Sequence, residues 1–468
     1  MSKWMGRILR LQGVDDETSQ SLYKRCLAIA WPATIEGILL SLISSLDMIM
    51  VGVLGSVAIT AVGLTSQPRM LLLVAVQSLC VGTTALVARR KGAGNDAGAR
   101  SCLQQSMILV TGVGIIITLI GVLFAEPFMR LGGANEDTLA LSSGYFRIIS
   151  LAFVPNCWQL CICAAFRAIG KTGITMVTNI IANLVNVVLN FLLISGRLGF
   201  PAWGVHGAAV ATAVGTVVAS IIALRFAYRS DSYFAYRPFK RLRFDRDTLQ
   251  GLAKVGSSSM AESIFLRVGF FINQILVAGL GTAAFAAFQI VSQVTSLSFT
   301  LGDGIAAAGV SMVAQSLGAR RKDRAQQYVV VVRRMSIIAS FLLMVTIFLL
   351  RRNLAQLFTS EAQVIESASY ALIVVVFGIM PQNGRVVYSG CLRGAGDVTY
   401  VAACSLVSVT LLRPLLTYLF CYPLDTMFPH LYLAATGAWI AFDIDAYVRN
   451  GLLSLRVRGG KWMNVRLK

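Results

Sequence analysis

The stretch WPATIEGILLSLISSLDMIMVGVLGSVAITAVGL, residues 31–64, decides the fold. Its first apolar run ends at the uncharged turn GVLGSVA (52–58), and a second apolar run follows directly. A helix that crosses a bilayer needs about 20 mostly apolar residues. The stretch therefore predicts two consecutive membrane-spanning helices joined by a short turn.

The rest of the chain repeats this pattern. Of the 468 residues, 56% are hydrophobic and 13% are charged, against about 25% charged residues in soluble domains. This composition excludes a soluble enzyme, a disulfide scaffold and a disordered chain. The apolar runs predict an all-α membrane protein with twelve transmembrane helices, centred near residues 40, 75, 114, 154, 185, 216, 266, 300, 340, 378, 410 and 443.

The turns alternate between strongly basic and uncharged. By the positive-inside rule the basic turns face the cytoplasm. This places both termini in the cytoplasm and predicts a multi-pass protein of the plasma (inner) membrane. The net charge of +20 resides in these turns, so the membrane topology accounts for it. We therefore expect no nucleic-acid partner. The basic turns contain Arg89, Arg90, Lys91, Arg167, Lys171, Arg237, Lys240, Arg241, Arg243, Arg246, Arg320, Arg321, Lys322, Arg324 and Arg393.

A long polar segment divides the chain into two halves. Residues 229–247 form the only long polar interior segment and separate two groups of six helices. We therefore expect an N-terminal lobe over 1–228 with helices 1–6, a cytoplasmic linker over 229–247, and a C-terminal lobe over 248–468 with helices 7–12.

An internal repeat supports the same division. One constant shift in residue number, which carries Glu36 onto Glu262, aligns polar residues as well as apolar ones. Six helices per half put both copies in the same orientation, and parallel repeats of this kind build transporters that work by alternating access. Without a gap, this repeat shift also aligns Gly55 with Gly281, Ser66 with Ser292, Gln67 with Gln293, Pro155 with Pro381, Arg167 with Arg393 and Gly170 with Gly396.

Asp47 is the leading candidate for a functional carboxylate. It lies 15 residues after Pro32, roughly 22 Å along a regular helix. A charge at bilayer depth costs about 2.5 to 3.5 kcal/mol, so such residues are functional candidates by default. Asn186 and Asn190 share one helix face, and Thr212 lies at a similar depth. Together they predict a cation-coupling pocket for H⁺ or Na⁺, with interhelical hydrogen bonding as the alternative for the uncharged members.

Other membrane-depth residues give weaker candidates. Pro32 either begins its helix or, if the helix begins near Cys26, forms a hinge in the first helix. Glu36, Glu262 and Asp303 are candidates for a substrate site or a second cation site, with structural pairing as the alternative. For Glu262 the nearest partner in sequence is Arg267, five residues on.

No motif indicates an enzyme. The chain lacks GxSxG, HExxH and Walker motifs, and no His/Cys spacing resembles a metal site. Asp443, Asp445 and Arg449 are expected to satisfy one another. The nine cysteines lie mostly in apolar runs, which argues against disulfides. We expect no catalytic residue, no metal and no cofactor beyond H⁺ or Na⁺ as the coupling ion.

The chain resembles the multidrug and toxic compound extrusion (MATE) family over nearly its full length. The resemblance rests on WPATIEG with Asp47, VGVLGSVAITAVGL, ALVARRKGAG, AFRAIGKT, CLRGAGDV, NVVLNFLLISG, GVHGAAVAT, VAGLGTAAFAAFQI and GKW. It implies twelve helices in two lobes and export of organic cations driven by inward H⁺ or Na⁺. It also implies that Asp47 is the coupling carboxylate, that Pro32 is the kink of the first helix, and that Asn186, Asn190 and Thr212 are partners of Asp47.

Two departures from the family pattern bear on the ion. Some relatives carry Asp where this chain has Asn190, and relatives with acidic residues midway along the tenth helix are not matched by ALIVVVFGIMPQNGRVVYSG. The pocket therefore has fewer charges, which favours protons over Na⁺.

These observations predict a secondary antiporter that exports cationic, amphipathic compounds by alternating access, and a monomer suffices for that mechanism. The alternative is a flippase for lipid-linked oligosaccharides or lipids of the same wider superfamily. Such a flippase needs a basic cavity, and only Arg267, Arg385 and Arg413 are candidates for one. A receptor or scaffold would need a partner surface, which the turns do not suggest.

Overall fold

The computed structural model describes residues 16–235, 245–358, 361–427 and 433–465. In these ranges all regular structure is helical, and every predicted helix centre falls in or beside a helix, so the all-α class is confirmed. Both chain termini, residues 236–244 of the predicted linker and His430 lie outside the described residues.

The described chain forms two compact units. The first-repeat unit contains residues between 35 and 257, and the second-repeat unit contains 16–34 and residues from 258 onward. The first helix, α2, contributes to both units, and the division at Thr34 falls two residues after Pro32. The lobe boundaries expected from the sequence remain predictions.

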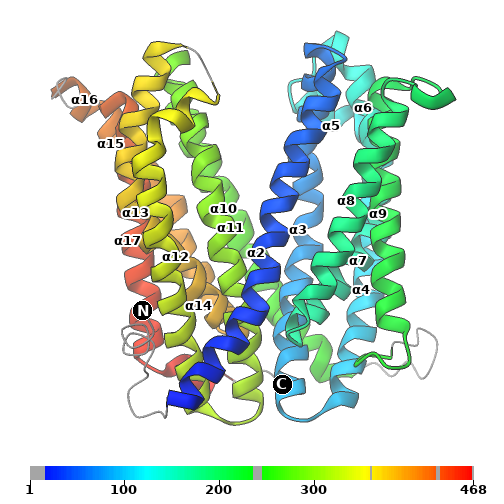
Figure 1. Cartoon of the computed structure of the whole chain (residues 1–468), viewed down its shortest axis with the longest axis vertical. Helices are drawn as coiled ribbons and strands as arrows, with labels where there is room; N and C mark the ends of the chain where they lie inside the picture. The colour runs from blue at the N-terminus through cyan, green and yellow to red at the C-terminus, as the bar shows by residue number, and fades with distance from the viewer. Residues whose placement is uncertain (1–15, 236–244, 359–360, 428–432, 466–468) are drawn as a thin grey trace. The chain divides into compact units, whose positions relative to one another are not determined.

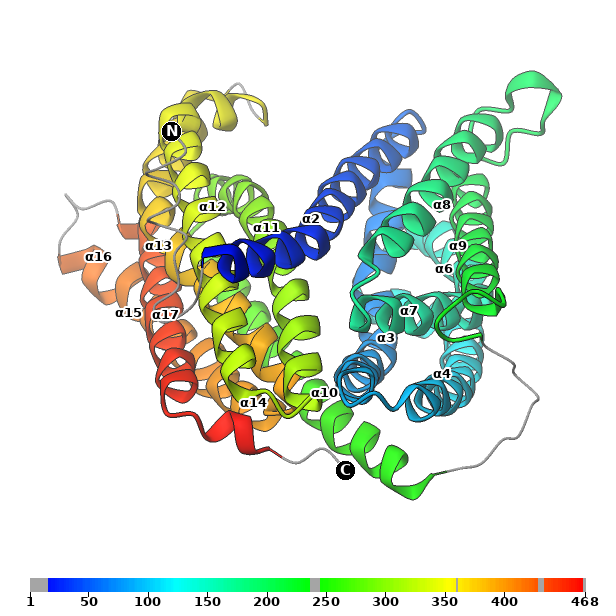
Figure 2. The same ribbon diagram turned by 60° about the horizontal axis from the view of Figure 1, so that its bottom comes forward.

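The first half of the chain is built from long helices joined by short turns, and α8 packs along α9 (Figures 1 and 2). Its elements are α2 (Asp16–Gly52), α3 (Ser56–Gly92), α4 (Asp96–Leu123), α5 (Ala125–Leu131), α6 (Glu136–Leu151), α7 (Phe153–Ala168), α8 (Thr172–Leu193), η1 (Arg197–Gly199) and α9 (Gly204–Tyr228).

In the second half, α11 and α17 both pack against α13 (Figure 1). The elements are α10 (Arg246–Ala278), α11 (Thr282–Gly318), α12 (Lys322–Gln356), α13 (Ala362–Ala395), α14 (Val398–Ser405), the π-helix η2 (Leu406–Leu412), α15 (Arg413–Cys421), α16 (Pro423–Met427), α17 (Leu433–Arg458) and η4 (Lys461–Asn464).

Ten described helices are long and apolar enough to cross a membrane, or eleven if the bent pair α6 and α7 forms one span. The last predicted helix, α17, is 26 residues long and carries Asp443, Asp445 and Arg449. With α17 the described helices match the twelve expected positions.

The fourth predicted helix is broken rather than continuous. α6 and α7 meet at Ala152 with a bend of 51°. Pro155 lies in the first turn of α7, where a missing backbone N–H is tolerated. A proline therefore permits a new helix to begin here, and the fourth predicted position is occupied by a bent pair of helices.

The internal repeat is visible in the backbone. Gly55 before α3 and Gly281 before α11 have φ of 98° and 103°. Gly170 and Gly396, which follow α7 and α13, have φ of 83° and 87°. Positive φ is costly for residues with a Cβ, so each turn requires glycine in both copies.

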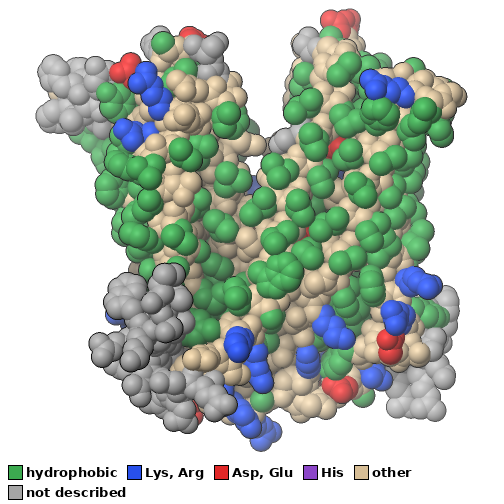
Figure 3. Space-filling view, viewed as in Figure 1, with side chains coloured by type: hydrophobic (Ala, Val, Ile, Leu, Met, Phe, Trp, Pro, Cys, Tyr) green, Lys and Arg blue, Asp and Glu red, His purple; other side chains and the backbone are tan. Residues whose placement is uncertain are grey.

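Hydrophobic side chains cover the middle of the visible helices, and Lys and Arg gather near their ends (Figure 3). Many large apolar residues are exposed, such as Ile49 at 66% and Phe377 at 64%. Exposed apolar surface of this extent faces lipid in a membrane protein. The chain is a multi-pass membrane protein.

Asp245 caps the first helix of the second half. Its carboxylate accepts hydrogen bonds from the Thr248 hydroxyl (2.5 Å) and backbone N–H (3.2 Å), and Arg90 lies 3.4 Å away. The Thr248 hydrogen bond holds the pKa of Asp245 below its usual range. We expect Asp245→Ala to lower stability by about 0.5–2 kcal/mol, measured by thermal unfolding in detergent. Since the folded-state pKa is lowered, this contribution is lost as the pH falls through that pKa, and Asp247→Ala is the control.

Candidate cation-coupling site

Three helices of the first-repeat unit bring the predicted pocket residues together. Asp47 lies on α2, Asn186 and Asn190 lie on α8, and Thr212 lies on α9. The buried residues of α8 recur every three or four positions and include both asparagines, so its polar face points into the unit. The four residues predicted from the sequence form one connected cluster.

Direct hydrogen bonds link the cluster. Asn190 Nδ2 donates to Asp47 Oδ1 at 2.9 Å and lies 3.4 Å from Asn186 Oδ1. The Asn186 amide lies 3.3 Å from the Thr212 hydroxyl. Asn186 and Asn190 are 5% and 1% exposed, whereas Asp47 is half-buried. The carboxylate is therefore accessible while its partners are fixed.

The Asn186 amide makes better contacts when its oxygen and nitrogen exchange places. Its nitrogen then donates to both oxygens of Asp47, at 2.8 and 3.0 Å, and its oxygen lies 3.3 Å from the Thr212 hydroxyl. Amide orientation is assigned from such networks. In this orientation Asp47 is held by two amide nitrogens, one from each asparagine.

Asn190 has an unused acceptor. Its Oδ1 is buried, and no described residue donates a hydrogen bond to it. A buried polar atom without a partner costs about 1–3 kcal/mol unless something else fills the site. Together with the Asp47 carboxylate, this oxygen can coordinate a hard cation, or it can accept a hydrogen bond from the hydroxyl of a protonated carboxyl group.

Tyr145 is a neighbour that the sequence reading missed. It is buried on α6, and its phenol lies next to Thr212. Nothing in its sequence context, SSGYFRII, separates it from a core aromatic residue. Only the fold brings Tyr145 to the pocket.

Glu36 belongs to a second cluster within the same unit. It is 7% exposed. Its carboxylate accepts hydrogen bonds from Thr175 Oγ1 at 2.9 Å and from Asn179 Nδ2, and Arg167 lies 3.9 Å away. These contacts are those of a structural carboxylate.

Glu262 occupies the equivalent position in the second-repeat unit. Arg393 donates to it at 2.6 and 3.2 Å, and Arg449 donates at 3.2 Å. The partial pairing with Arg267 that the sequence left possible is not observed among the described residues, because guanidinium groups from α13 and α17, Arg393 and Arg449, take that role. Arg167 and Arg393 are repeat-equivalent, so both copies pair the same Glu and Arg positions. The repeat shift aligns Glu36 with Glu262 and Arg167 with Arg393, so this pairing was readable from the sequence.

The predicted mutual pairing of Asp443, Asp445 and Arg449 is also wrong. Asp445 pairs with Arg413, and Arg449 donates to Ser405 at 2.5 Å as well as to Glu262. Asp445 and Arg449 are four residues apart and share one face of α17, but each is paired with a residue of a neighbouring helix, Asp445 with Arg413 and Arg449 with Glu262.

Asp303 on α11 is exposed, and no described residue forms a hydrogen bond with it. Its charge interactions are with Arg393 and Arg385. A Cβ on Gly304 would lie 2.9 Å from the Thr34 Cα, so the expected close backbone approach beside Asp303 is present.

Pro32 lies in the interior of α2, which is described from Asp16. A position in the first turn is thereby excluded. A proline inside a helix frees the carbonyl four residues earlier and weakens the helix locally. The hinge role remains a prediction.

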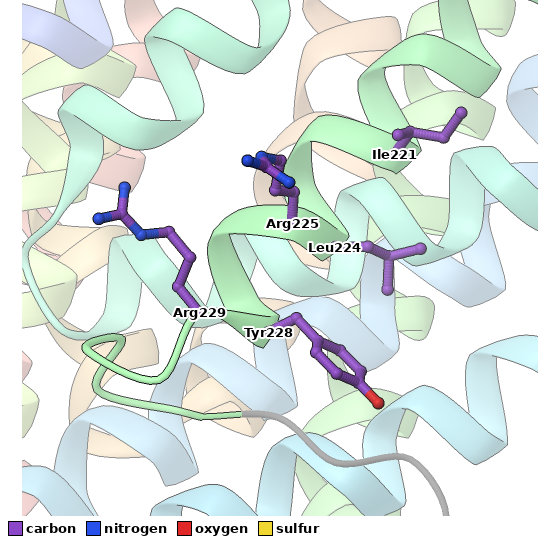
Figure 4. Close-up of a pocket in the computed structure, with 5 residues that line it drawn as sticks. All are labelled: Ile221, Leu224, Arg225, Tyr228 and Arg229. Atoms are coloured by element: carbon purple, nitrogen blue, oxygen red, sulfur yellow. The ribbon is translucent and has the colours of Figure 1, made fainter.

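An open pocket of about 740 Å³ lies at the C-terminal end of α9 (Figure 4). It is lined by Ile221, Leu224, Arg225, Tyr228 and Arg229. The lining offers no carboxylate to an organic cation, and Arg229 pairs with Asp231 at 2.9 Å.

Comparisons with known proteins identify the family. A family model described as MatE matches the chain twice, over residues 32–192 and 259–419. The probable multidrug resistance protein NorM of Thermotoga maritima is 29% identical over 95% of this chain and 94% of that protein. The NorM protein of Bradyrhizobium diazoefficiens is 27% identical over 88% of each chain.

Solved structures share the fold. A multidrug resistance MATE family transporter of the MOP superfamily, in an outward-facing conformation, matches with a TM-score of 0.87. It is 22% identical, and the match covers 95% of this chain and 97% of that one. A MATE protein in the bent conformation matches with a TM-score of 0.85 and 22% identity, over 97% and 98% of the two chains.

Two copies of a repeat of membrane helices, each with buried polar clusters, define a transporter architecture. Because the family model covers both copies, the chain belongs to the MATE family of transporters.

Proposed function

We propose that this transporter is a secondary antiporter that exports amphipathic organic cations in exchange for inward-moving H⁺ or Na⁺. One observation carries the proposal: Asp47 is a membrane-depth carboxylate bound by Asn190, beside a buried oxygen that has no donor among the described residues. The multidrug resistance names of two relatives support the substrate class.

The mechanism follows from the charge of Asp47. Protonation or cation binding neutralises the carboxylate, weakens its hold on the α8 amides and biases α2 toward a bent form at Pro32. Each proton that moves inward releases about 2.3 kcal/mol per 100 mV, enough for a substrate gradient of tens-fold. With one carboxylate in the pocket, we favour H⁺ as the coupling ion.

We further propose a plasma (inner) membrane location with both termini in the cytoplasm, since basic turns are retained on that side. A monomer suffices for the mechanism. Cargo recognition is expected to involve exposed carboxylates such as Asp303.

The decisive experiment measures efflux of a fluorescent organic cation from proteoliposomes under an imposed pH gradient and, separately, under an imposed Na⁺ gradient. Flux under one gradient identifies an antiporter and its ion. Absence of flux under both gradients contradicts the proposal and favours the flippase, which would be tested next with a fluorescent lipid-linked oligosaccharide.

Asn190→Asp should raise Na⁺ affinity. It places a second carboxylate beside Asp47, and ligand charge sets the affinity of oxygen sites for hard cations. We expect the Na⁺ concentration that half-saturates thermal stabilisation to fall by about 10-fold or more. Asn183→Asp is the matched control, because Asn183 bonds to the Asn179 carbonyl instead. Equal shifts in both variants would place the cation elsewhere.

A further inference from the structure

The second-repeat unit contains a counterpart of the Asp47 pocket. The repeat shift that carries Glu36 onto Glu262 also aligns Asp47 with Asn273. In the first copy, Asn190 donates to Asp47 at 2.9 Å. In the second copy, Thr417 donates to Asn273 at 2.6 Å. The same pair of helix positions is therefore in contact in both copies.

The π-helix η2 explains why Asn190 aligns with Thr417, one residue beyond the repeat shift. α8 begins at Thr172 and α14 at Val398, and these two positions still obey that shift. The π turn between 406 and 412 then inserts one residue. Asn186, four residues before Asn190, consequently aligns with Arg413, four residues before Thr417.

The last helix of each copy aligns with a slightly larger shift, which carries Gly207 onto Gly437. A Cβ on Gly207 would lie 2.6 Å from the Leu193 carbonyl oxygen, and a Cβ on Gly437 would lie 2.9 Å from the Phe420 Cβ. Leu193 and Phe420 are themselves equivalent once the extra residue of η2 is counted. This register aligns Thr212 with Phe442 and Gly215 with Asp445.

The contacts of the first pocket recur with different chemistry. Asn186 lies 3.3 Å from the Thr212 hydroxyl, whereas Arg413 lies over the Phe442 ring at 4.6 Å. A Cβ on Gly215 would lie 3.1 Å from the Asn186 Cβ. The equivalent Asp445 forms an ion pair with Arg413.

In the second copy, an internal ion pair between Arg413 and Asp445 occupies the pocket. Arg413 and Asp445 are 1% and 0% exposed. Arg413 Nε donates to Asp445 at 3.1 Å, the Ser408 hydroxyl also donates to Asp445, and the Phe270 ring covers Arg413 at 4.9 Å. Net charge is zero at this pair, against −1 for ionised Asp47.

The charged residues around this ion pair do not form a second cation site. Asp443 and Arg385 interact electrostatically with Arg413, and Arg385 also interacts with Arg449. Two arginines, 385 and 413, thus accompany the carboxylates 443 and 445. The four charges sum to zero, so the group has no net negative charge to attract an added cation.

We infer that Arg413 is a built-in cation that occupies, in the second copy, the place of the exchangeable cation in the first. The transporter therefore has one exchangeable-cation site of this type, at Asp47. The inference deepens the proposed function and rests on it for the role of Asp47.

The test counts cations bound per chain by the full-length, purified protein. The probes are ²²Na⁺ binding at alkaline pH and proton uptake on acidification. Wild type should bind one Na⁺ that Asp47→Asn does not bind, and on acidification it should take up one proton more than Asp47→Asn. A saturable cation that remains in Asp47→Asn would show an exchangeable site elsewhere and overturn the inference.

A conversion variant tests the equivalence directly. Asn273→Asp with Arg413→Asn and Asp445→Ala rebuilds the first-copy charge pattern. In the Asp47→Asn background, it should restore one bound cation per chain. No restored binding in a folded, monodisperse variant would overturn the inference.

In the same Asp47→Asn background, the control Arg413→Met with Asp445→Leu removes the pair without adding a carboxylate, and it should restore no cation binding. If the conversion variant does not fold, the count in Asp47→Asn alone decides. Failure of the proposed function looks different: wild type, Asp47→Asn and the conversion variant would all bind equally little. Failure of the inference alone leaves Asp47-dependent binding intact in wild type.

Discussion

Asp47→Asn should reduce gradient-driven efflux to the rate of protein-free liposomes. The substitution preserves shape and hydrogen-bonding capacity but removes the only ionisable carboxylate in the cluster with Asn186, Asn190 and Thr212. Since an amide neither takes up a proton at physiological pH nor changes charge, neither ion gradient can bias the two states. The measurement is dye efflux under imposed pH and Na⁺ gradients.

A matched control is Glu126→Gln. Glu126 is exposed and pairs with Arg130 one turn away at 2.8 Å, a contact worth little. Its efflux should equal that of wild type. Thermal unfolding of Asp47→Asn should also stay near the wild-type value, which separates lost coupling from lost folding. Wild-type efflux by Asp47→Asn would rule out the proposed coupling site.

Glu262→Gln should give the largest loss of stability. Glu262 is 1% exposed and balances two guanidinium groups, Arg393 and Arg449. Removing one partner of a buried ion pair costs about 3–5 kcal/mol, because Arg449, whose side chain is 2% exposed, then stays buried without compensation. Thermal or denaturant unfolding in detergent measures the effect.

The repeat supplies the control for this prediction. Glu36→Gln alters the equivalent position, where the guanidinium of Arg167 is 3.9 Å away and 33% exposed. We expect a smaller loss, about 1–3 kcal/mol, from the disturbed hydrogen bonds of Thr175 and Asn179. The double variant Glu262→Gln with Arg449→Met should recover part of the loss. Equal losses at Glu36 and Glu262 would contradict the ion-pair argument.

Sequence patterns predicted most of the fold. Each apolar run became a helix because the bilayer leaves the backbone few alternatives to internal hydrogen bonding. The repeat was readable since Glu, Gln, Pro and Arg align rarely by chance. The break at Ala152 was not predicted, because a proline that starts a helix and a proline that bends one have the same local sequence.

The pocket around Asp47 was also predictable, because helix periodicity and depth place Asn186, Asn190 and Thr212 on compatible faces. Its finer structure was not. Tyr145 joins the pocket from α6, and the partners of Glu262 come from positions 393 and 449, on helices far along the chain. Sequence proximity favoured Arg267, whereas the fold selected arginines on neighbouring helices.

The sequence by itself determined the class of protein, the helix positions, the two-copy organisation and the residue types of the coupling pocket. These follow from hydrophobic length and periodicity, which are local properties of the chain. Only the tertiary structure decided which charges neutralise one another: Glu262 with Arg393 and Arg449, and Arg413 with Asp445. Such pairing depends on close approach between helices distant in sequence, and small changes such as the extra residue in η2 determine which side chains meet.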